Sequence, residues 1–277
     1  MIKYSFIIIL TFILTPLWAQ SESDFIVTFT TDRAGVVITD YIGRSPSDRP
    51  IPGIEGGFYT NPGSPHPVRI PTTIQNLPVK EIGDRAFRGK DITSVIIPEG
   101  VTKIGNYSFS SCSYLSSVTF PNTLTHISEF AFSGCRELRT ITIPSNVTFI
   151  GQAAFSNTGL TSINWPSRLT TIPNAVFAQT SLQSIVIPEG VTIIADFAFS
   201  NCTSLTSVTL PSTIVEIGSE AFRNCSALFT LNIPTSISNI RFVNLHGFMP
   251  HNSFEGCNRI PLATQARLRD LGYEGNF

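Results

Sequence analysis

The amino-acid sequence predicts a repeat solenoid, and three observations support this fold class. Prolines that close a short apolar stretch recur with spacings of 23, 23, 22, 22, 23 and 23 residues: Pro98, Pro121, Pro144, Pro166, Pro188, Pro211 and Pro234. One position of each repeat is a phenylalanine: Phe87, Phe109, Phe132, Phe155, Phe177, Phe199 and Phe222. An alternating apolar segment precedes most of the prolines. A fixed period of this length is typical of stacked coils, so we expect about seven coils of 22–23 residues around a stacked aromatic core.

Two elements are predicted within each coil. The segment L-x-x-V-x-L, as in residues 205–210, ends with a period of two and favours a short strand whose polar residues face outward. Strands of successive coils would pair in parallel. Before the repeat phenylalanine stands a residue that often begins helices, namely Asp84, Asn106, Asn174, Asp196 or Ser219. We therefore expect one strand and one tight turn, with room for about one helical turn, in each coil.

The full repeat resembles a known family. Its pattern, L-x-x-V-x-L-P-x-x-[VIL]-x-x-I-G-x-x-A-F-x-x-C, is similar to the BspA-type bacterial leucine-rich repeat of surface proteins from oral anaerobes and treponemes, and it covers residues 68–240. The ending LATQARLRDLGYEGNF from Leu262 resembles the C-terminal cap of treponemal members, and GVVITDYIG from Gly35 resembles their first strand. The resemblance implies a leucine-rich repeat with a parallel β-sheet on its concave face and short helical turns or loops elsewhere. It also implies surface or secreted proteins that bind host or bacterial partners, without catalytic residues.

The cysteines follow the repeat. Four of the five lie three residues after a repeat phenylalanine, and Cys257 lies three residues after Phe254. Units with Lys90, Thr158 or Thr180 at this position have a loop that is one residue shorter. This correlation favours buried thiols that fill a particular loop shape. Disulfides between neighbouring coils remain the alternative, because stacked positions about 4.8 Å apart are within bridging range.

A glycine follows the repeat isoleucine in several coils, for example at Gly105 and Gly151. Pro173 occupies the same position in another coil, and proline fixes φ near about −65°. A positive φ is therefore not required there, and we expect tight turning instead.

Both ends of the repeat region carry irregular segments. Between Gly43 and Val68 the chain is rich in proline and glycine, which predicts a projecting loop with Phe58 and Tyr59 at its centre. An ordinary mobile insertion without a partner is the alternative. RFVNLHGFMPHNS is inserted between Ile240 and Phe254, and we expect its apolar residues Phe242, Phe248 and Met249 to seal the last coil. Pro261 and Gly272 bracket a predicted helix that lies across that coil.

The N-terminus has the pattern of a secretory signal peptide. Lys3 is followed by 14 predominantly apolar residues, from Tyr4 to Leu17, and Ala19 is a small residue suited to cleavage. A membrane anchor is the competing interpretation, but a spanning helix needs about 20 residues. The sequence thus predicts a signal peptide at 1–19, an N-terminal cap with the proline- and glycine-rich insertion at 20–67, repeats at 68–240 and a C-terminal cap at 241–277, with no transmembrane segment in the mature chain.

The sequence offers little for catalysis or cofactors. A net charge of −1 gives no basic field for nucleic acid, and we expect no such partner. His246, His251 and Cys257 could be imagined as zinc ligands, but their spacing matches none of the usual pairs. Because no nucleophile, metalloprotease or phosphate-loop motif occurs either, we expect no enzyme activity and no cofactor.

The outward positions of the predicted strands form the candidate binding surface. Most of them are serine, threonine or asparagine, with Arg139 as the charged member, and the exceptions are Ile96, Val186 and Phe229. Such a face can simply be a solvated sheet. The partner-binding residues that we predict are the apolar exceptions and Arg139 on this face, together with the two aromatic residues of the loop: Ile96, Arg139, Val186, Phe229, Phe58 and Tyr59.

These observations favour an exported, non-enzymatic binding or adhesion protein that recognises a host extracellular matrix protein or another bacterial surface protein. A structural envelope protein without a specific partner is the second hypothesis. An enzyme is the third, and it would need a catalytic constellation that the motifs do not supply. We expect the chain at the cell surface or secreted, with the periplasm as the remaining compartment.

Overall fold

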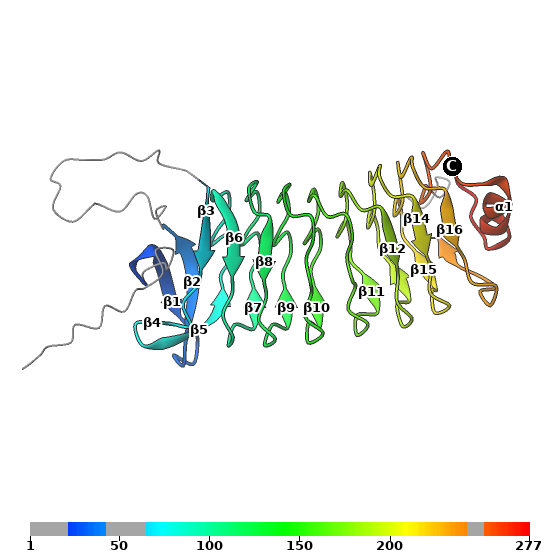
Figure 1. Ribbon diagram of the computed structural model, residues 1–277. Helices are drawn as coiled ribbons and strands as arrows, with labels where there is room; N and C mark the ends of the chain where they lie inside the picture. Colours follow the sequence, from blue (N-terminus) through cyan, green and yellow to red (C-terminus); the bar gives the residue numbers. More distant parts are fainter. Residues whose placement is uncertain (1–21, 43–64, 243–251) are drawn as a thin grey trace, which may run out of the picture.

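The computed structural model describes residues 22–42, 65–242 and 252–277, and within them the chain forms an elongated stack of coils (Figure 1). A three-residue 3-10 helix at Glu22–Asp24 comes first. The strands are β1 Phe25–Phe29, β2 Val36–Tyr41, β3 His66–Arg69, β4 Thr73–Ile74, β5 Leu77–Ile82, β6 Ile92–Ile96, β7 Lys103–Ile104, β8 Ser117–Thr119, β9 His126–Ile127, β10 Phe149–Ile150, β11 Thr171–Ile172, β12 Ser184–Val186, β13 Ile193–Ile194, β14 Ser207–Thr209, β15 Glu216–Ile217, β16 Thr230–Asn232 and β17 Arg241–Phe242. One α-helix, α1 Leu262–Asp270, follows them.

The strands lie in two rows along the stack (Figure 1). The first row comprises the predicted L-x-x-V-x-L strands, which pair in parallel as β3-β6-β8 and as β12-β14-β16. The second row consists mostly of two-residue strands that end on the repeat isoleucine, such as Ile104 and Ile194. The parallel solenoid of the sequence analysis is confirmed, but the second row was not predicted, because two residues are too few to show a period.

The aromatic core is a continuous stack of rings. Phe254 extends the series of seven repeat phenylalanines by one coil, and Tyr41 stacks on Phe87 at the other end with ring centroids 5.0 Å apart. Centroid separations between neighbouring phenylalanines run from 4.8 to 6.2 Å, and the widest lies between Phe155 and Phe177. All eight phenylalanine side chains are fully buried. Stacking in register therefore fixes how each coil sits on the next.

The turn before the repeat phenylalanine is not helical, so that part of the prediction was wrong. The residue two positions before the phenylalanine has a positive φ in each of the seven coils from Phe87 to Phe222, as at Tyr107 with 56° and Phe130 with 55°. The expected capping residues bind the next coil instead of their own. Asp84 Oδ1 accepts from the Asn106 N–H at 2.7 Å, and Asp196 Oδ1 accepts from the Ser219 N–H at 2.7 Å. These polar residues thus link coils across the stack.

The cysteines are free and fully buried, as predicted. Each Sγ donates to the carbonyl of the repeat phenylalanine in the preceding coil: for example, Cys112 bonds Phe87 at 3.0 Å and Cys225 bonds Phe199 at 3.1 Å. Where threonine replaces cysteine, Thr158 bonds the carbonyl of Phe155 in its own coil at 2.8 Å. The longer loop therefore lets a thiol reach the neighbouring coil. Burial raises the pKa of Cys112 to about 12.

The glycines after the repeat isoleucine have no positive φ, in agreement with the argument from Pro173. Glycine fits at these positions because the backbones of two neighbouring coils approach closely and leave no room for a Cβ. A Cβ at Gly151 would lie 2.5 Å from the Glu129 nitrogen of the preceding coil, and one at Gly105 would lie 2.6 Å from Asp84 Oδ1.

Both strand rows are interrupted in the middle of the stack. The second row breaks between β10 and β11, and the gap is visible in Figure 1. In regular coils the residue after the isoleucine donates its N–H to the preceding coil, as Gly151 does to Ile127 at 2.8 Å. Proline at position 173 has no N–H to donate. In the first row, residues 139–142 and 161–164 lack the strand that the sequence predicted, at the point where long loops give way to shorter ones.

The ends of the stack are closed differently. Strand β1 pairs antiparallel with β2, so the GVVITDYIG segment forms the second strand of the fold and not the first. At the other end, α1 covers the last coil, where Figure 1 shows it beyond β16. Phe242 packs edge-on against Tyr273 with centroids 5.1 Å apart, which agrees with its expected sealing role. Phe248 and Met249, the signal peptide and residues 43–64 of the predicted loop lie outside the described residues. The end of that loop was predicted wrongly, because His66 and Pro67 belong to strand β3, which pairs with β6.

Candidate functional site

The first strand row presents a polar outward face. Register aligns Val186 with Thr209 and Asn232, and Ile96 with Thr119, so corresponding side chains form straight rows along the stack. The inward positions between them, such as Val208, belong to the core. The outward side chains are therefore held in fixed rows, one coil apart, by the parallel register.

The predicted apolar residues are exposed but do not form one patch. Val186 is 70% exposed, Phe229 57% and Ile96 36%. Ile96 and Val186 share one row, but three coils lie between them, which is a separation of about 19 Å at about 4.8 Å per coil. Phe229 lies in another row, next to Thr206, whose carbonyl accepts its N–H at 3.1 Å. The face thus offers separate apolar points and not a continuous hydrophobic surface.

Arg139 lies on the same face, in the interrupted middle of the row. Its Nη2 is 3.3 Å from Glu137 Oε2, and both side chains are largely exposed. Its charge is therefore partly compensated within its own loop. Phe58 and Tyr59 lie outside the described residues, so their role stays a prediction.

The sequence analysis missed other aromatic residues at the surface, of which Tyr107 and Phe130 are partly buried and Phe149 is exposed. Tyr107 and Phe130 stack at the outer turns with centroids 4.8 Å apart, and the guanidinium groups of Arg85 and Arg88 lie over the Tyr107 ring at 5.8 and 5.7 Å. Phe149, on the second strand row, is 46% exposed. Alignment of the repeats would have shown these positions as aromatic exceptions, but only the predicted strand positions were compared.

The break in the second row contains a cavity of about 360 Å³. Phe149, Arg168, Thr170 and Pro173 are among the residues that line it. In this row the coil of Pro173 lacks the backbone hydrogen bonds that join other coils, whereas Phe155 and Asn157 still donate to Val176 and Ala178 on another side of the stack.

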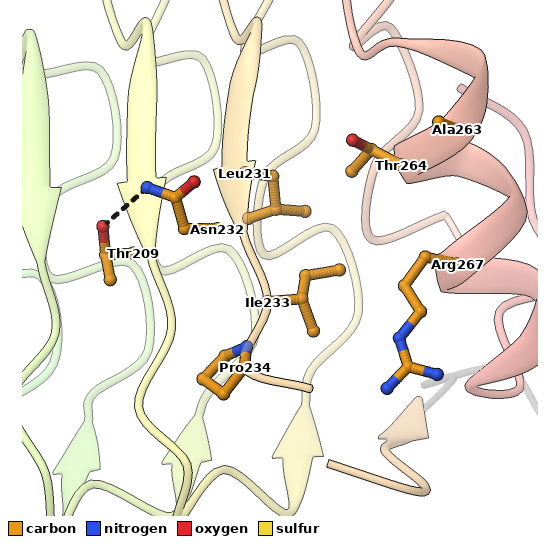
Figure 2. Close-up of a pocket in the computed structure, with 8 residues that line it drawn as sticks. All are labelled: Thr209, Leu231, Asn232, Ile233, Pro234, Ala263, Thr264 and Arg267. Carbon is orange, nitrogen blue, oxygen red and sulfur yellow. Dashed lines mark hydrogen bonds between the residues drawn. The ribbon is translucent and has the colours of Figure 1, made fainter. Parts of the chain in front are cut away.

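A larger cleft of about 450 Å³ lies between the last strand of the first row and the terminal helix (Figure 2). One wall consists of β16 with the two residues after it, and the other of α1. The lining residues are Thr209, Leu231, Asn232, Ile233, Pro234, Ala263, Thr264 and Arg267. Asn232 donates from its side-chain amide to Thr209 Oγ1 at 3.2 Å, and Arg267 extends from α1 into the space beside Pro234 (Figure 2).

Within the described residues, no group of three or more histidine, cysteine, aspartate or glutamate side chains is arranged to hold a metal. Cys257, one member of the zinc alternative, is buried and bonds the Phe222 carbonyl at 3.0 Å. His246 and His251 lie outside the described residues. In the same part of the chain, no helix has the length and apolar character to cross a membrane.

The fold and these surfaces define a class, that of repeat solenoids that present extended strand faces. The sequence profile described as BspA type leucine rich repeat region matches residues 80–194 and 170–260 in six copies. The chain belongs to this family. Among curated proteins, none matches the chain.

Solved structures agree with the family. A leucine rich repeat protein from T. pallidum, TpLRR, is 27% identical, with 94% of this chain and 98% of that chain covered and a TM-score of 0.62. A leucine-rich repeat protein from Bacteroides ovatus is 18% identical, with 90% and 96% covered and a TM-score of 0.42. The chain is thus similar to the T. pallidum leucine rich repeat protein along almost its whole length.

Proposed function

We propose that this chain is an exported, non-enzymatic binding protein that uses its solenoid surface to recognise another macromolecule, either a host extracellular matrix protein or another bacterial surface protein. The observation that carries the proposal is the outward face of the first strand row. There, β12, β14 and β16 hold small polar side chains in register around exposed apolar residues such as Val186. Solenoids commonly use such extended faces for binding.

Recognition by this face depends on contact more than on charge. The charged residues of this face are few: Arg139 is paired with Glu137, and Arg69 in β3 is aligned with Ile96. Binding should therefore vary little between low and physiological ionic strength, because only charges at the rim are screened by salt. We expect the contact energy to concentrate on the exposed apolar residues of this face, of which Phe229 has the largest side chain.

Adhesion of the purified chain from Gln20 to immobilised host matrix proteins, and to intact bacteria, tests the proposal. Phe229→Ala and Val186→Ser should weaken adhesion several-fold. Phe149→Ala is the control, because it changes an exposed aromatic residue on the other strand row, and it should leave adhesion unchanged. Circular dichroism of each variant checks the fold. If all three variants adhere as strongly as the unchanged chain, the binding surface lies elsewhere.

Export is part of the proposal and needs its own experiment. A protease added to intact cells should digest the chain if it lies at the surface, and osmotic release should free it if it is periplasmic. A chain that is exported but adheres to nothing would favour the alternative of a structural envelope protein.

A further inference from the structure

The cleft between β16 and α1 borders the last strand of the first row. In this row, alternate residues bond opposite neighbours. Leu210 donates its N–H forward to the Asn232 carbonyl at 3.0 Å, and Thr230 donates its N–H backward to Thr206 at 2.9 Å. By the same alternation, the backbone N–H and C=O groups of Leu231 and Ile233 point forward, away from β14 and toward α1.

Among the described residues, no further strand pairs with these groups. Ile260 lies where Leu228 lies one coil earlier, three residues after the cysteine, so residues 261–264 hold the place of the next strand. Pro261 and α1 occupy that place instead. A helix with its side chains is about 10–12 Å across, whereas neighbouring strands lie about 4.8 Å apart, so α1 cannot approach β16 as a strand would.

The result is an open strand edge inside a walled cleft. The ladder between β14 and β16 uses the backbone groups of Thr230 and Asn232. Outside this ladder, no backbone hydrogen bond among the described residues involves the N–H or C=O of Leu231 or the N–H of Ile233. Both residues line the cleft, with Ala263 and Thr264 on the opposite wall (Figure 2). Unpaired backbone N–H and C=O groups, spaced as they are along a strand edge, are complementary to the backbone of another extended chain.

We propose that this edge binds an extended peptide segment of a partner protein, which adds to β16 as a further strand. The inference deepens the proposed function by naming the chemistry of the partner. Leu231 to Pro234 lie along the cleft, so the bound segment spans about four residues at about 3.3 Å per residue. Arg267 is the charged residue among those that line the cleft. Its Nη2 donates to the Ile237 carbonyl, a neutral acceptor, so its positive charge has no acid partner in this bond and favours an acidic residue in the segment.

Two variants change the cleft: Ala263 is exposed, whereas Ile233 is partly buried against the core, so circular dichroism must show that Ile233→Pro keeps the fold. Ala263→Trp places a large side chain in the cleft from an exposed helix position, and Ala266→Trp is its matched control on the same helix, also exposed but outside the lining. Ile233→Pro removes the N–H that faces the cleft, and no sheet hydrogen bond in the described structure depends on it. Proline is tolerated on strand edges whose N–H has no partner.

The probe is a library of random twelve-residue peptides displayed on phage, selected against the full chain from Gln20. Selected peptides should bind Ala263→Trp and Ile233→Pro at least tenfold more weakly than the unchanged chain, and Ala266→Trp equally well. They should also slow hydrogen exchange at the amides of Leu231 and Ile233. N-methylation of alternate peptide amides should abolish binding, because it removes the backbone donors that a strand needs.

Recovery of no peptide sensitive to Ala263→Trp would overturn the inference. So would concentration-dependent dimerisation that Ala263→Trp abolishes, because the edge would then belong to a second copy of the chain. Adhesion that persists unchanged in Ala263→Trp would also overturn it while leaving the proposed function intact. Peptide binding at the cleft without adhesion to matrix or bacteria would support the inference even though the proposed function fails.

Discussion

Pro173 lies beside Ile150 of the neighbouring coil, and the backbone hydrogen bond that joins coils at this position elsewhere is missing between them. Ala195, Gly151 and Gly218 each donate this bond to the isoleucine of the preceding coil, at 2.7–2.9 Å. Pro173 has no N–H and therefore cannot supply this bond at the break between β10 and β11, where the cavity lined by Phe149 lies.

Pro173→Ala should restore this link, because alanine occupies the same position at Ala195. The new hydrogen bond contributes about 0.5–1.5 kcal/mol, offset by about 0.4–1 kcal/mol from the less restricted unfolded chain. Stability should thus change little, but the amide introduced at position 173 should be protected from hydrogen exchange. Rapid exchange there would mean that the change in loop length alone holds the coils apart.

Removal of a core ring should be costly, and more so where the stack is tight. Phe199 has ring neighbours at 5.5 and 5.1 Å, whereas those of Phe155 lie at 5.8 and 6.2 Å. Either change to alanine should lower the free energy of unfolding by about 3–5 kcal/mol, with Phe199→Ala the larger because ring stacking adds to burial. Urea denaturation measures both, and a larger loss for Phe155→Ala would contradict this order.

The buried thiols should react slowly in the folded chain. Burial raises the pKa of Cys112 to about 12 and raises that of Cys135 well above its ordinary value, so little thiolate exists near neutral pH. At Cys202, the effect of burial is outweighed by hydrogen bonds with Cys225 and Thr180, which lower the pKa, but this side chain is fully buried like the other four. Because reagents cannot reach them, alkylation followed by mass spectrometry should label all five cysteines quickly only after unfolding. A mass that indicates a bridge between Cys112 and Cys135, or between Cys202 and Cys225, would contradict the free-thiol state.

The same shift predicts instability in alkali. A thiol whose folded pKa is raised binds its proton more tightly in the folded state, so its contribution is intact below the ordinary value of 9.0 and is lost as pH rises toward about 12. Each pH unit in this window should cost up to about 1.4 kcal/mol for Cys112. Urea midpoints measured from pH 8 to 11, with Cys112→Ala as the control, should show a shallower decline in the variant.

Deletion of residues 46–65 should leave the melting temperature nearly unchanged if this segment projects from the fold. The strands that flank it are each paired with a neighbour, β2 with β5 and β3 with β6. A short glycine-serine linker in its place keeps those pairs, and calorimetry compares the two chains. A marked loss of stability would show that the segment packs against the first coils.

The repeat identified the fold because its signals are local and recur. Phenylalanine, cysteine and the alternating strand residues each occupy a fixed position, and seven repetitions average out the irregularities of any single coil. The buried, unbridged cysteines followed from one local correlation, that of thiol with loop length. The terminal helix followed from Pro261 and Gly272, whose backbone preferences are intrinsic.

The relations between coils depended on the tertiary structure. How the coils stack decides three features that no single coil shows. Asp84 binds the next coil, the turns take positive φ, and Ile96 and Val186 lie too far apart to form one patch. The open edge of β16 is likewise a property of its neighbours, because the segment that should supply the next strand forms α1 instead. Local sequence determined what each coil is, and packing between coils decided which groups remained free to bind.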